Sequence, residues 1–307
     1  MSATAIVFAY HNVGVRCLSV LLDAGVHVPL VLTHTDNPTE TIWFASVAEL
    51  AARHGITTIT PEDANAPDVL ARLRQLRPDF LFSFYYRQML KPALLALAPR
   101  GAYNLHGSLL PKYRGRVPVN WAVINGERET GATLHEMVEK PDAGRIVDQQ
   151  AVPILENDTA GEVFGKVTVA AEMTLHRALP RLIDGTAELR AQNLGAGSYF
   201  GGRKPADGVI DWRNSAFEIH NLVRGVAPPY PGAMTTLQGA AARVLRTLQQ
   251  PAISGPTLWP RLFVDDGRIL ATCGDGGTLH ILELEVEGQP LSPAGFAARF
   301  GPEVAMV

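Results

Sequence analysis

Residues 67–84 read PDVLARLRQLRPDFLFSF and join a helical pattern to a strongly apolar run. The first part, Pro67–Leu76, predicts a helix. The second part, Asp79–Phe84, predicts a strand, and its nearly unbroken apolar run is typical of a strand that is covered on both faces of a sheet. A helix that leads into such a strand is the repeating unit of a parallel sheet packed between helices.

The same alternation of strand and helix continues on both sides of this stretch. The residues before it predict strands at 4–8, 28–33 and 56–60, and helices at 13–23 and 47–54. After it, Ala102–Leu105 is interpreted as the last parallel strand. We therefore expect an α/β fold with a Rossmann-like, mostly parallel sheet.

The second half of the chain has a different pattern. Strands are predicted at 131–138 and 146–154, and a long helix at 159–182. Beyond the glycine-rich stretch 191–208 the pattern predicts one helix, 215–226, and then only strands, at 233–238, 241–248, 261–265, 268–273 and 278–286. We expect a first domain at 1–190, a linker at 191–208, and a small antiparallel β-barrel or sandwich at 209–307.

Composition and charge disfavour several classes of protein. The 307 residues include 27 Lys and Arg against 30 Asp and Glu, so general attraction to nucleic acid or to an anionic membrane is not expected. Cys17 and Cys273 lack the spacing of a disulfide framework or of a metal site. The sequence shows no apolar run of about 18 residues and no signal-peptide pattern at its start, so we expect a cytoplasmic protein.

Several familiar catalytic motifs do not occur in the sequence. The segment after the first strand, Ala9–Gly14, holds a single glycine instead of the GxGxxG of dinucleotide binding, and there is no GxxxxGK[ST] loop. The histidines show no HExxH spacing, so no metal is expected, and no GxSxG turn indicates an esterase. Nicotinamide redox chemistry and P-loop hydrolysis are therefore disfavoured.

The most informative stretch begins at the end of the last parallel strand and reads NLHGSLLPKYRGRVP at 104–118. Asn104 and His106 are two residues apart on the predicted strand, so their side chains point to the same side. An amide donor beside an imidazole suits a developing oxyanion and a proton transfer, whereas the alternative is that both satisfy loop backbone groups. Asp142 is the candidate partner, because a carboxylate beside His106 favours the protonated ring and fixes its orientation. The alternative for Asp142 is a turn aspartate.

Two further groups of residues suit a ligand. Lys112, Arg114 and Arg116 form a basic cluster around Tyr113, which either captures an anionic substrate or lies in solvent. The residues FYYR at 84–87 either stack on a flat heterocycle or consist of a core aromatic followed by surface tyrosines. The sequence leaves both pairs of alternatives open.

Asn104 and His106, the SLLP at 108–111 and Asp142 together resemble the site of the folate-dependent formyltransferases, which transfer a formyl group from 10-formyltetrahydrofolate to an amine. The resemblance covers nearly the whole chain. Within the family the sequence is most similar to the formyltransferase part of the bifunctional polymyxin-resistance protein, which formylates UDP-4-amino-4-deoxy-L-arabinose for lipid A modification. The similar stretches are FAYH at 8–11, THTDNP at 33–38, FSFYYR at 82–87, residues 104–118, NGE at 125–127 and TGATLH at 130–135.

The resemblance implies a role for each site residue. It implies that His106 transfers the proton, that Asn104 stabilises the transition state, and that Asp142 keeps His106 protonated. It also implies an OB-like C-terminal domain and 10-formyltetrahydrofolate as co-substrate, without a metal. The implied co-substrate contacts are Gln88, Met89, Leu90, Arg116, Val138, Glu139, Lys140, Pro141 and Asp142. Two departures stand out, because the sequence does not contain the oxidative-decarboxylase domain of the bifunctional members and Pro141 stiffens the loop before Asp142.

From this resemblance we expect a nucleotide-linked amino sugar as partner, with UDP-4-amino-4-deoxy-L-arabinose first and dTDP-linked amino sugars as the alternative. A methionyl-tRNA formyltransferase is a further alternative, although residues 205–307 carry 7 basic and 10 acidic side chains, which disfavours RNA binding. A hydrolase of the formyl-folate and a non-catalytic folate-binding protein are the remaining alternatives. Self-association and a separate decarboxylase partner stay open.

Overall fold

The computed structural model describes residues 3–38, 40–251 and 259–306. The chain divides into two compact units, each of which is described by itself. Unit 1 comprises residues 1–118, 130–152 and 165–201, and unit 2 comprises residues 119–129, 153–164 and 202–307. The predicted domain boundaries at 190 and 209 stay predictions.

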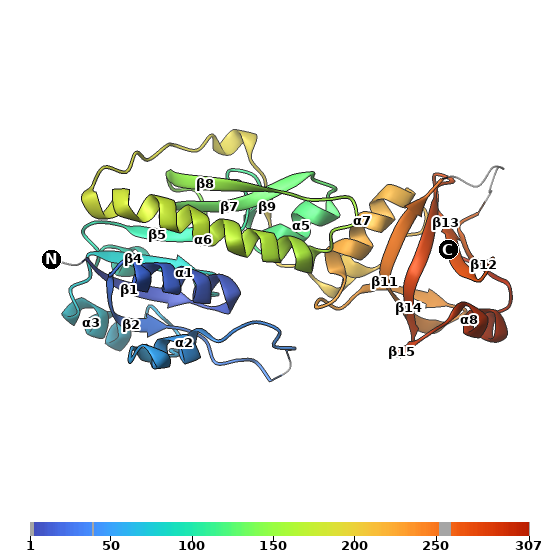
Figure 1. The fold of residues 1–307 in the computed structure, drawn as a ribbon, viewed down its shortest axis with the longest axis horizontal. Coiled ribbons are helices and arrows are strands. Elements are labelled where there is room, and N and C mark those ends of the chain that lie inside the picture. The colour runs from blue at the N-terminus through green and yellow to red at the C-terminus, as the bar shows by residue number, and fades with distance from the viewer. Residues whose placement is uncertain (1–2, 39, 252–258, 307) are drawn as a thin grey trace. The chain divides into compact units, whose positions relative to one another are not determined.

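Unit 1 is built on a seven-stranded sheet in the order β3-β2-β1-β4-β5-β7-β8 (Figure 1). Its strands are β1 (Thr4–Ala9), β2 (His27–Leu32), β3 (Thr57–Ile59), β4 (Phe80–Phe84), β5 (Ala102–His106), β7 (Glu129–Glu136) and β8 (Ile146–Pro153). The first five strands pair in parallel, and β7 is antiparallel to β5. The predicted Rossmann-like sheet is confirmed, including β5 as the last parallel strand.

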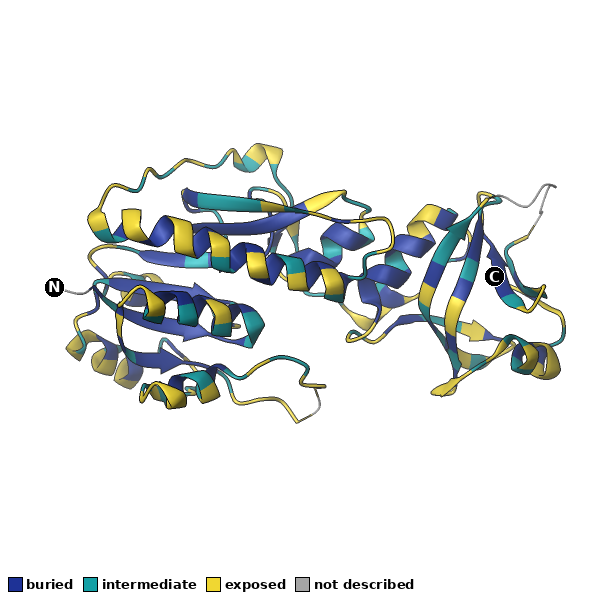
Figure 2. Ribbon diagram, in the orientation of Figure 1, coloured by how far each residue is buried: buried dark blue, intermediate teal, exposed yellow. Residues whose placement is uncertain are grey.

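The sheet of unit 1 is covered by helices with exposed outer faces, and Figure 2 shows most of its strands as buried, whereas the edge strand β8 is largely intermediate or exposed. The helices are α1 (His11–Asp23), α2 (Val47–Arg53), α3 (Pro67–Gln75), α4 (Pro92–Leu95) and α6 (Ala160–Asp184). In β1 the side chains of Ile6 and Phe8 pack with Val69 and Leu73 of α3. Because side chains alternate along a strand, the neighbouring Ala5 and Val7 face the opposite side of the sheet, and they are fully buried there.

A small parallel pair joins the loop after β5 to a segment far along the chain. β6 (Arg114–Gly115) pairs with β9 (Tyr199–Phe200). Gly115 has φ +100°, and a Cβ on it would lie 2.1 Å from the carbonyl oxygen of Phe200. Only glycine fits this close approach of two backbones.

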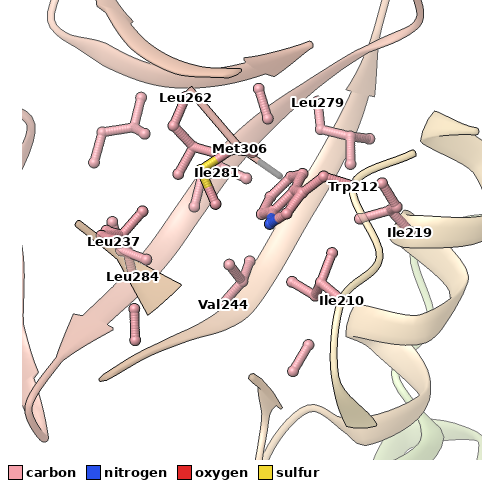
Figure 3. Packing of buried hydrophobic residues seen from close by; sticks show 14 of the residues in the cluster. Ile210, Trp212, Ile219, Leu237, Val244, Leu262, Leu279, Ile281, Leu284 and Met306 are labelled. Carbon is pink, nitrogen blue, oxygen red and sulfur yellow. The ribbon is translucent and has the colours of Figure 1, made fainter. Parts of the chain in front are cut away.

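Unit 2 contains a curled antiparallel sheet in the order β10-β11-β14-β13-β12-β16, with β15 beside β14. Its strands are β10 (Ala233–Leu237), β11 (Ala240–Gln250), β12 (Arg261–Asp265), β13 (Arg268–Thr272), β14 (Thr278–Val286), β15 (Gln289–Pro290) and β16 (Glu303–Ala305). Trp212 lies at the centre of the core of this unit (Figure 3), and its indole N–H donates to Thr235 Oγ1 at 2.9 Å. The predicted antiparallel C-terminal fold is confirmed.

The helices of unit 2 were only partly predicted. α7 (Ala216–Val226) begins at a capping box formed by Ser215 and Glu218, as Ser-x-x-Glu predicts. The expectation of strands alone after residue 226 is wrong, because α8 (Pro293–Phe300) follows β15. Phe296 and Phe300 are four residues apart and both buried, which is helical spacing that the sequence analysis did not use. α5 (Pro118–Ile124) was missed as well.

Candidate active site

The polar residues Asn104 and His106 lie at the carboxyl end of β5 in unit 1, where parallel strands present ligand-binding loops. Their side chains share one face of the sheet, as the strand alternation predicts. The antiparallel neighbour β7 places His135 directly opposite Asn104 and Thr133 opposite His106. Asn104 Nδ2 lies 3.1 Å from His135 Nε2, so the cross-strand pair is also a hydrogen-bonded pair.

Asp142 belongs to the loop between β7 and β8, and this loop folds back towards His106. Its Oδ1 lies 3.5 Å from His106 Nδ1 and 3.5 Å from His135 Nε2. Its Oδ2 accepts a hydrogen bond of 2.8 Å from the backbone N–H of Gly115. Asp142 has φ +51°, in the left-handed region that costs a non-glycine residue energy. The structure thus places His106 and His135 beside one carboxylate oxygen of Asp142, and Asn104 joins this group through His135.

The charges around Asp142 keep this carboxyl group ionised. Burial alone would raise its pKa. The charge of His106 and the hydrogen bond from the Gly115 N–H outweigh that burial, so the pKa of Asp142 lies well below its usual range. Asp142 is therefore a fixed negative charge at neutral pH.

Each ring nitrogen of His106 faces an oxygen atom of a neighbouring residue. Nε2 lies 2.8 Å from the carbonyl oxygen of Tyr113, which can only accept, so Nε2 carries a hydrogen. Nδ1 faces the Asp142 carboxylate. Both nitrogens therefore face acceptors, which fixes the orientation of the ring.

The loop at 107–113 is fixed by a threonine on β7. Thr133 Oγ1 donates to the carbonyl of Ser108 at 2.6 Å and accepts from the N–H of Leu110 at 3.1 Å. The Ser108 hydroxyl in turn donates to the carbonyl of Lys112 at 2.7 Å. The Tyr113 ring stacks on Phe200, with ring centroids 5.1 Å apart. The SLLP segment is therefore a rigid frame that holds the Tyr113 carbonyl against His106.

The structure separates the members of the predicted basic cluster. Arg114 is buried, with 8% of its surface exposed, and its guanidinium lies 3.4 Å from the carbonyl oxygen of Leu194. Lys112 and Arg116 are exposed. Arg114 thus supports the loop from inside, and only the other two basic residues face solvent.

The residues expected to contact the co-substrate lie in three segments of unit 1. After β4, the Gln88 amide bonds the backbone of 61–64, Leu90 is buried in the core, and Met89 presents an exposed side chain. In the loop that carries Asp142, Val138, Glu139 and Lys140 are exposed and Pro141 is partly buried. The backbone N–H of Arg116 donates to the carbonyl of Phe200, while its side chain is exposed. Their contacts with a ligand stay predictions.

An aromatic cluster gathers three of the segments that carried the family resemblance, 8–11, 33–38 and 82–87. The Tyr10 hydroxyl donates to Asp36 at 2.6 Å, and the His34 ring stacks on Tyr86 with centroids 4.2 Å apart. Arg87 lies over the Tyr10 ring at 4.8 Å and donates its backbone N–H to His34 Nε2. Tyr86 is buried, so the reading of FYYR as a core aromatic with surface tyrosines is wrong for this tyrosine.

His135 is the residue of this site that the sequence analysis missed. It was considered as a histidine without metal-ligand spacing and as the last residue of the similar stretch TGATLH, and no role was assigned to it. Its signal was the strand predicted at 131–138, but the register that sets it opposite Asn104 depends on a pairing that spacing along the chain does not reveal. Among the described residues no group of His, Cys, Asp and Glu has the arrangement of a metal site. Within the same residues, no helix has the length and apolar character needed to cross a membrane.

Solved structures with a similar fold include sugar-modifying enzymes. An N-formyltransferase from Helicobacter canadensis, in complex with folinic acid and dTDP-3-aminofucose, is 22% identical, with a TM-score of 0.71 over 92% of this chain and 99% of that one. WlaRD, a sugar 3N-formyl transferase studied with dTDP and 5-N-formyl-THF, is 20% identical, with a TM-score of 0.72 over 94% and 99%. HypX from Aquifex aeolicus, in complex with tetrahydrofolic acid, is 16% identical, with a TM-score of 0.64 over 96% of this chain and 47% of that chain. At these identities the likeness shows the fold.

The family is shown by the sequence match. Residues 17–179 match the formyl transferase family, and residues 203–301 match the C-terminal domain of formyl transferases. The first match includes Asn104, His106, His135 and Asp142, and the second covers most of the curled sheet of unit 2. The chain therefore belongs to the formyl transferase family.

Proposed function

We propose that this protein transfers the formyl group of 10-formyltetrahydrofolate to the amine of a nucleotide-linked amino sugar. The observation that carries the proposal is the group of Asn104, His106 and Asp142 at the carboxyl end of β5, in a chain of the formyl transferase family. The co-substrate supplies an activated formyl group on nitrogen, and the chain's own residues supply donors and a proton carrier.

The proposed chemistry assigns one task to each side chain. When the neutral amine attacks the formyl carbon, the carbonyl oxygen gains negative charge, and a hydrogen of Asn104 Nδ2 stabilises it. The amine must lose a proton and the folate nitrogen must gain one as its bond to carbon breaks. His106 moves this proton, and Asp142 holds the ring in place with a fixed negative charge. The products are a formamide and tetrahydrofolate.

The acceptor is proposed as a dTDP-linked amino sugar. This choice is supported by the similar fold of enzymes whose structures contain dTDP or dTDP-3-aminofucose. UDP-4-amino-4-deoxy-L-arabinose, the acceptor favoured by the resemblance in residues 8–11, 33–38 and 82–87, is the competing candidate. The two differ in the base and in the sugar, so one panel of acceptors separates them.

The test is mass spectrometry of each acceptor after incubation with the protein and 10-formyltetrahydrofolate, with folate release followed in parallel. The panel contains dTDP-3-amino and dTDP-4-amino sugars, UDP-4-amino-4-deoxy-L-arabinose, initiator methionyl-tRNA and a reaction without acceptor. We expect a formylated dTDP-sugar whose formation is lost with His106→Ala. Product only from the UDP-sugar or from the tRNA would refute the proposed acceptor. Formate released without any acceptor would refute formyl transfer to an amine.

A further inference from the structure

We propose that His135 is a positioning residue for formyl transfer, which acts through Asn104 and fixes the orientation of its amide. This inference rests on the proposed function, because that function makes Asn104 the donor to the developing oxyanion. The geometry behind it lies entirely within unit 1. His135 is not expected to touch the substrates, since only 2% of its side chain is exposed.

The backbone pairing places His135 where it can act on Asn104. The two residues are direct partners in the antiparallel register of β5 and β7, so their side chains leave the same face of the sheet. Asn104 Nδ2 lies 3.1 Å from His135 Nε2. Asn104 is partly exposed, whereas His135 is buried behind it, so the histidine supports the amide from the protein side.

The other ring nitrogen determines which tautomer His135 adopts. Nδ1 lies 2.8 Å from the carbonyl oxygen of Glu136, and because a carbonyl only accepts, Nδ1 carries a hydrogen. In the neutral ring Nε2 then has a lone pair and accepts a hydrogen bond from Asn104 Nδ2. A reversed Asn104 amide would set its carbonyl oxygen against that lone pair. His135 therefore keeps the Asn104 nitrogen in place, and the second hydrogen of this nitrogen stays available for the oxyanion.

Only the neutral ring of His135 can orient Asn104, because a protonated Nε2 cannot accept its hydrogen bond. Asp142 Oδ1 lies 3.5 Å from Nε2, and the His106 ring lies 6.4 Å away between centroids. The Glu136 carboxylate is bonded by Arg145 at 2.6 Å through both of its oxygens. A proton on Nε2 would point towards Asp142 and would set two donors, Nε2 and Asn104 Nδ2, against each other.

Two substitutions separate positioning from a structural role. The terminal amide of glutamine reaches the place of Nε2, and that of asparagine reaches the place of Nδ1. We expect His135→Gln, which can still accept from Asn104, to keep kcat within about threefold of the wild-type value. His135→Asn keeps only the bond to Glu136, and we expect it to lower kcat about 10- to 100-fold with both KM values within about twofold. His176→Gln, at an exposed position on α6, is the matched control and should be unchanged. An active His135→Asn variant would overturn the proposal.

If both His135→Gln and His135→Asn are impaired, a double-mutant cycle shows whether His135 acts through Asn104. In an Asn104→Ala background, His135→Asn should cost less than about a further twofold, because the residue it orients is already gone. A full additional loss of 10-fold or more would show that His135 acts on something else.

A measurement without turnover distinguishes failure of this inference from failure of the proposed function. In protein with ¹⁵N-labelled histidine, the ring resonances that disappear in His135→Gln should show the tautomer with hydrogen on Nδ1 at pH 7.5. A hydrogen on Nε2 would overturn the inference even in an active enzyme. If no acceptor is formylated but the Nδ1–H tautomer is found, the proposed function fails and the arrangement of Asn104 and His135 stands.

Discussion

The substitution Asp142→Asn tests how the site holds its charge. It removes one negative charge and keeps nearly the same shape, so the new amide oxygen can still accept from the Gly115 N–H. Asp142 Oδ1 lies 3.5 Å from His106 Nδ1, with both side chains largely buried. At an effective dielectric constant of about 20, a pair of unit charges at this distance attracts by about 5 kcal/mol.

This attraction sets the expected loss of activity. Each 1.36 kcal/mol is about a factor of ten in rate, so losing the full attraction lowers kcat by several thousandfold, and partial compensation by solvent leaves at least about a hundredfold. The KM for the nucleotide-sugar should change little, because the carboxylate acts on His106 and not on the nucleotide. Initial rates of formylated-sugar formation at pH 7.5, measured at saturating co-substrate, give both constants.

A matched control separates this effect from damage to the fold. Asp148 on β8 is similarly buried and binds Arg177 Nε at 2.6 Å, outside the site. Asp148→Asn should alter stability and leave kcat within about twofold. A wild-type kcat in folded Asp142→Asn protein would refute the reasoning, because the charge would then contribute nothing to the reaction.

Three further predictions concern stability. Asp142 has a lowered pKa, so its ionised form stabilises the fold fully above about pH 5 and ever less as the pH falls below about 4. In urea unfolding, the difference in free energy of unfolding between wild type and Asp142→Asn should therefore be smaller at pH 3 than at pH 6. An equal difference at both pH values would refute this prediction. Gly115→Ala sets a methyl group against the Phe200 carbonyl and should cost about 1–3 kcal/mol and most of the activity, measured by urea unfolding and rate assays; full stability would contradict the close approach. Trp212→Ala empties the core of unit 2 and should lower the free energy of unfolding by about 3–5 kcal/mol, which calorimetry with a Trp259→Ala control at an exposed position would check.

Local pattern predicted most of the fold. The alternation of apolar strands and amphipathic helices up to β5 depends on neighbouring residues, and the structure confirms it with shifts of one or two residues at the ends. The same method missed α5 and α8, although it found α2, which is equally short. It also missed the pairing of β6 with β9, which joins residues more than 80 apart.

The candidate site was predicted as far as chain proximity allowed. Asn104 and His106 lie on one strand, so their shared direction followed from alternation alone. His135 and the buried position of Arg114 depend on strand register and on packing from 194–200, which are properties of the folded chain. Motif spacing therefore indicated the reacting groups, and it gave no information on the residues that support them.

The pairing of β6 with β9 has a consequence for any attempt to isolate the N-terminal half. A fragment that stops at residue 190 would contain Asn104, His106 and Asp142, but it would lose the Ser198 hydroxyl and the Phe200 ring that hold Tyr113. The Tyr113 carbonyl is the partner of His106 Nε2. A fragment that keeps the contacts of Tyr113 must therefore extend past Phe200, and a search for minimal relatives should require that strand as well as the three polar residues.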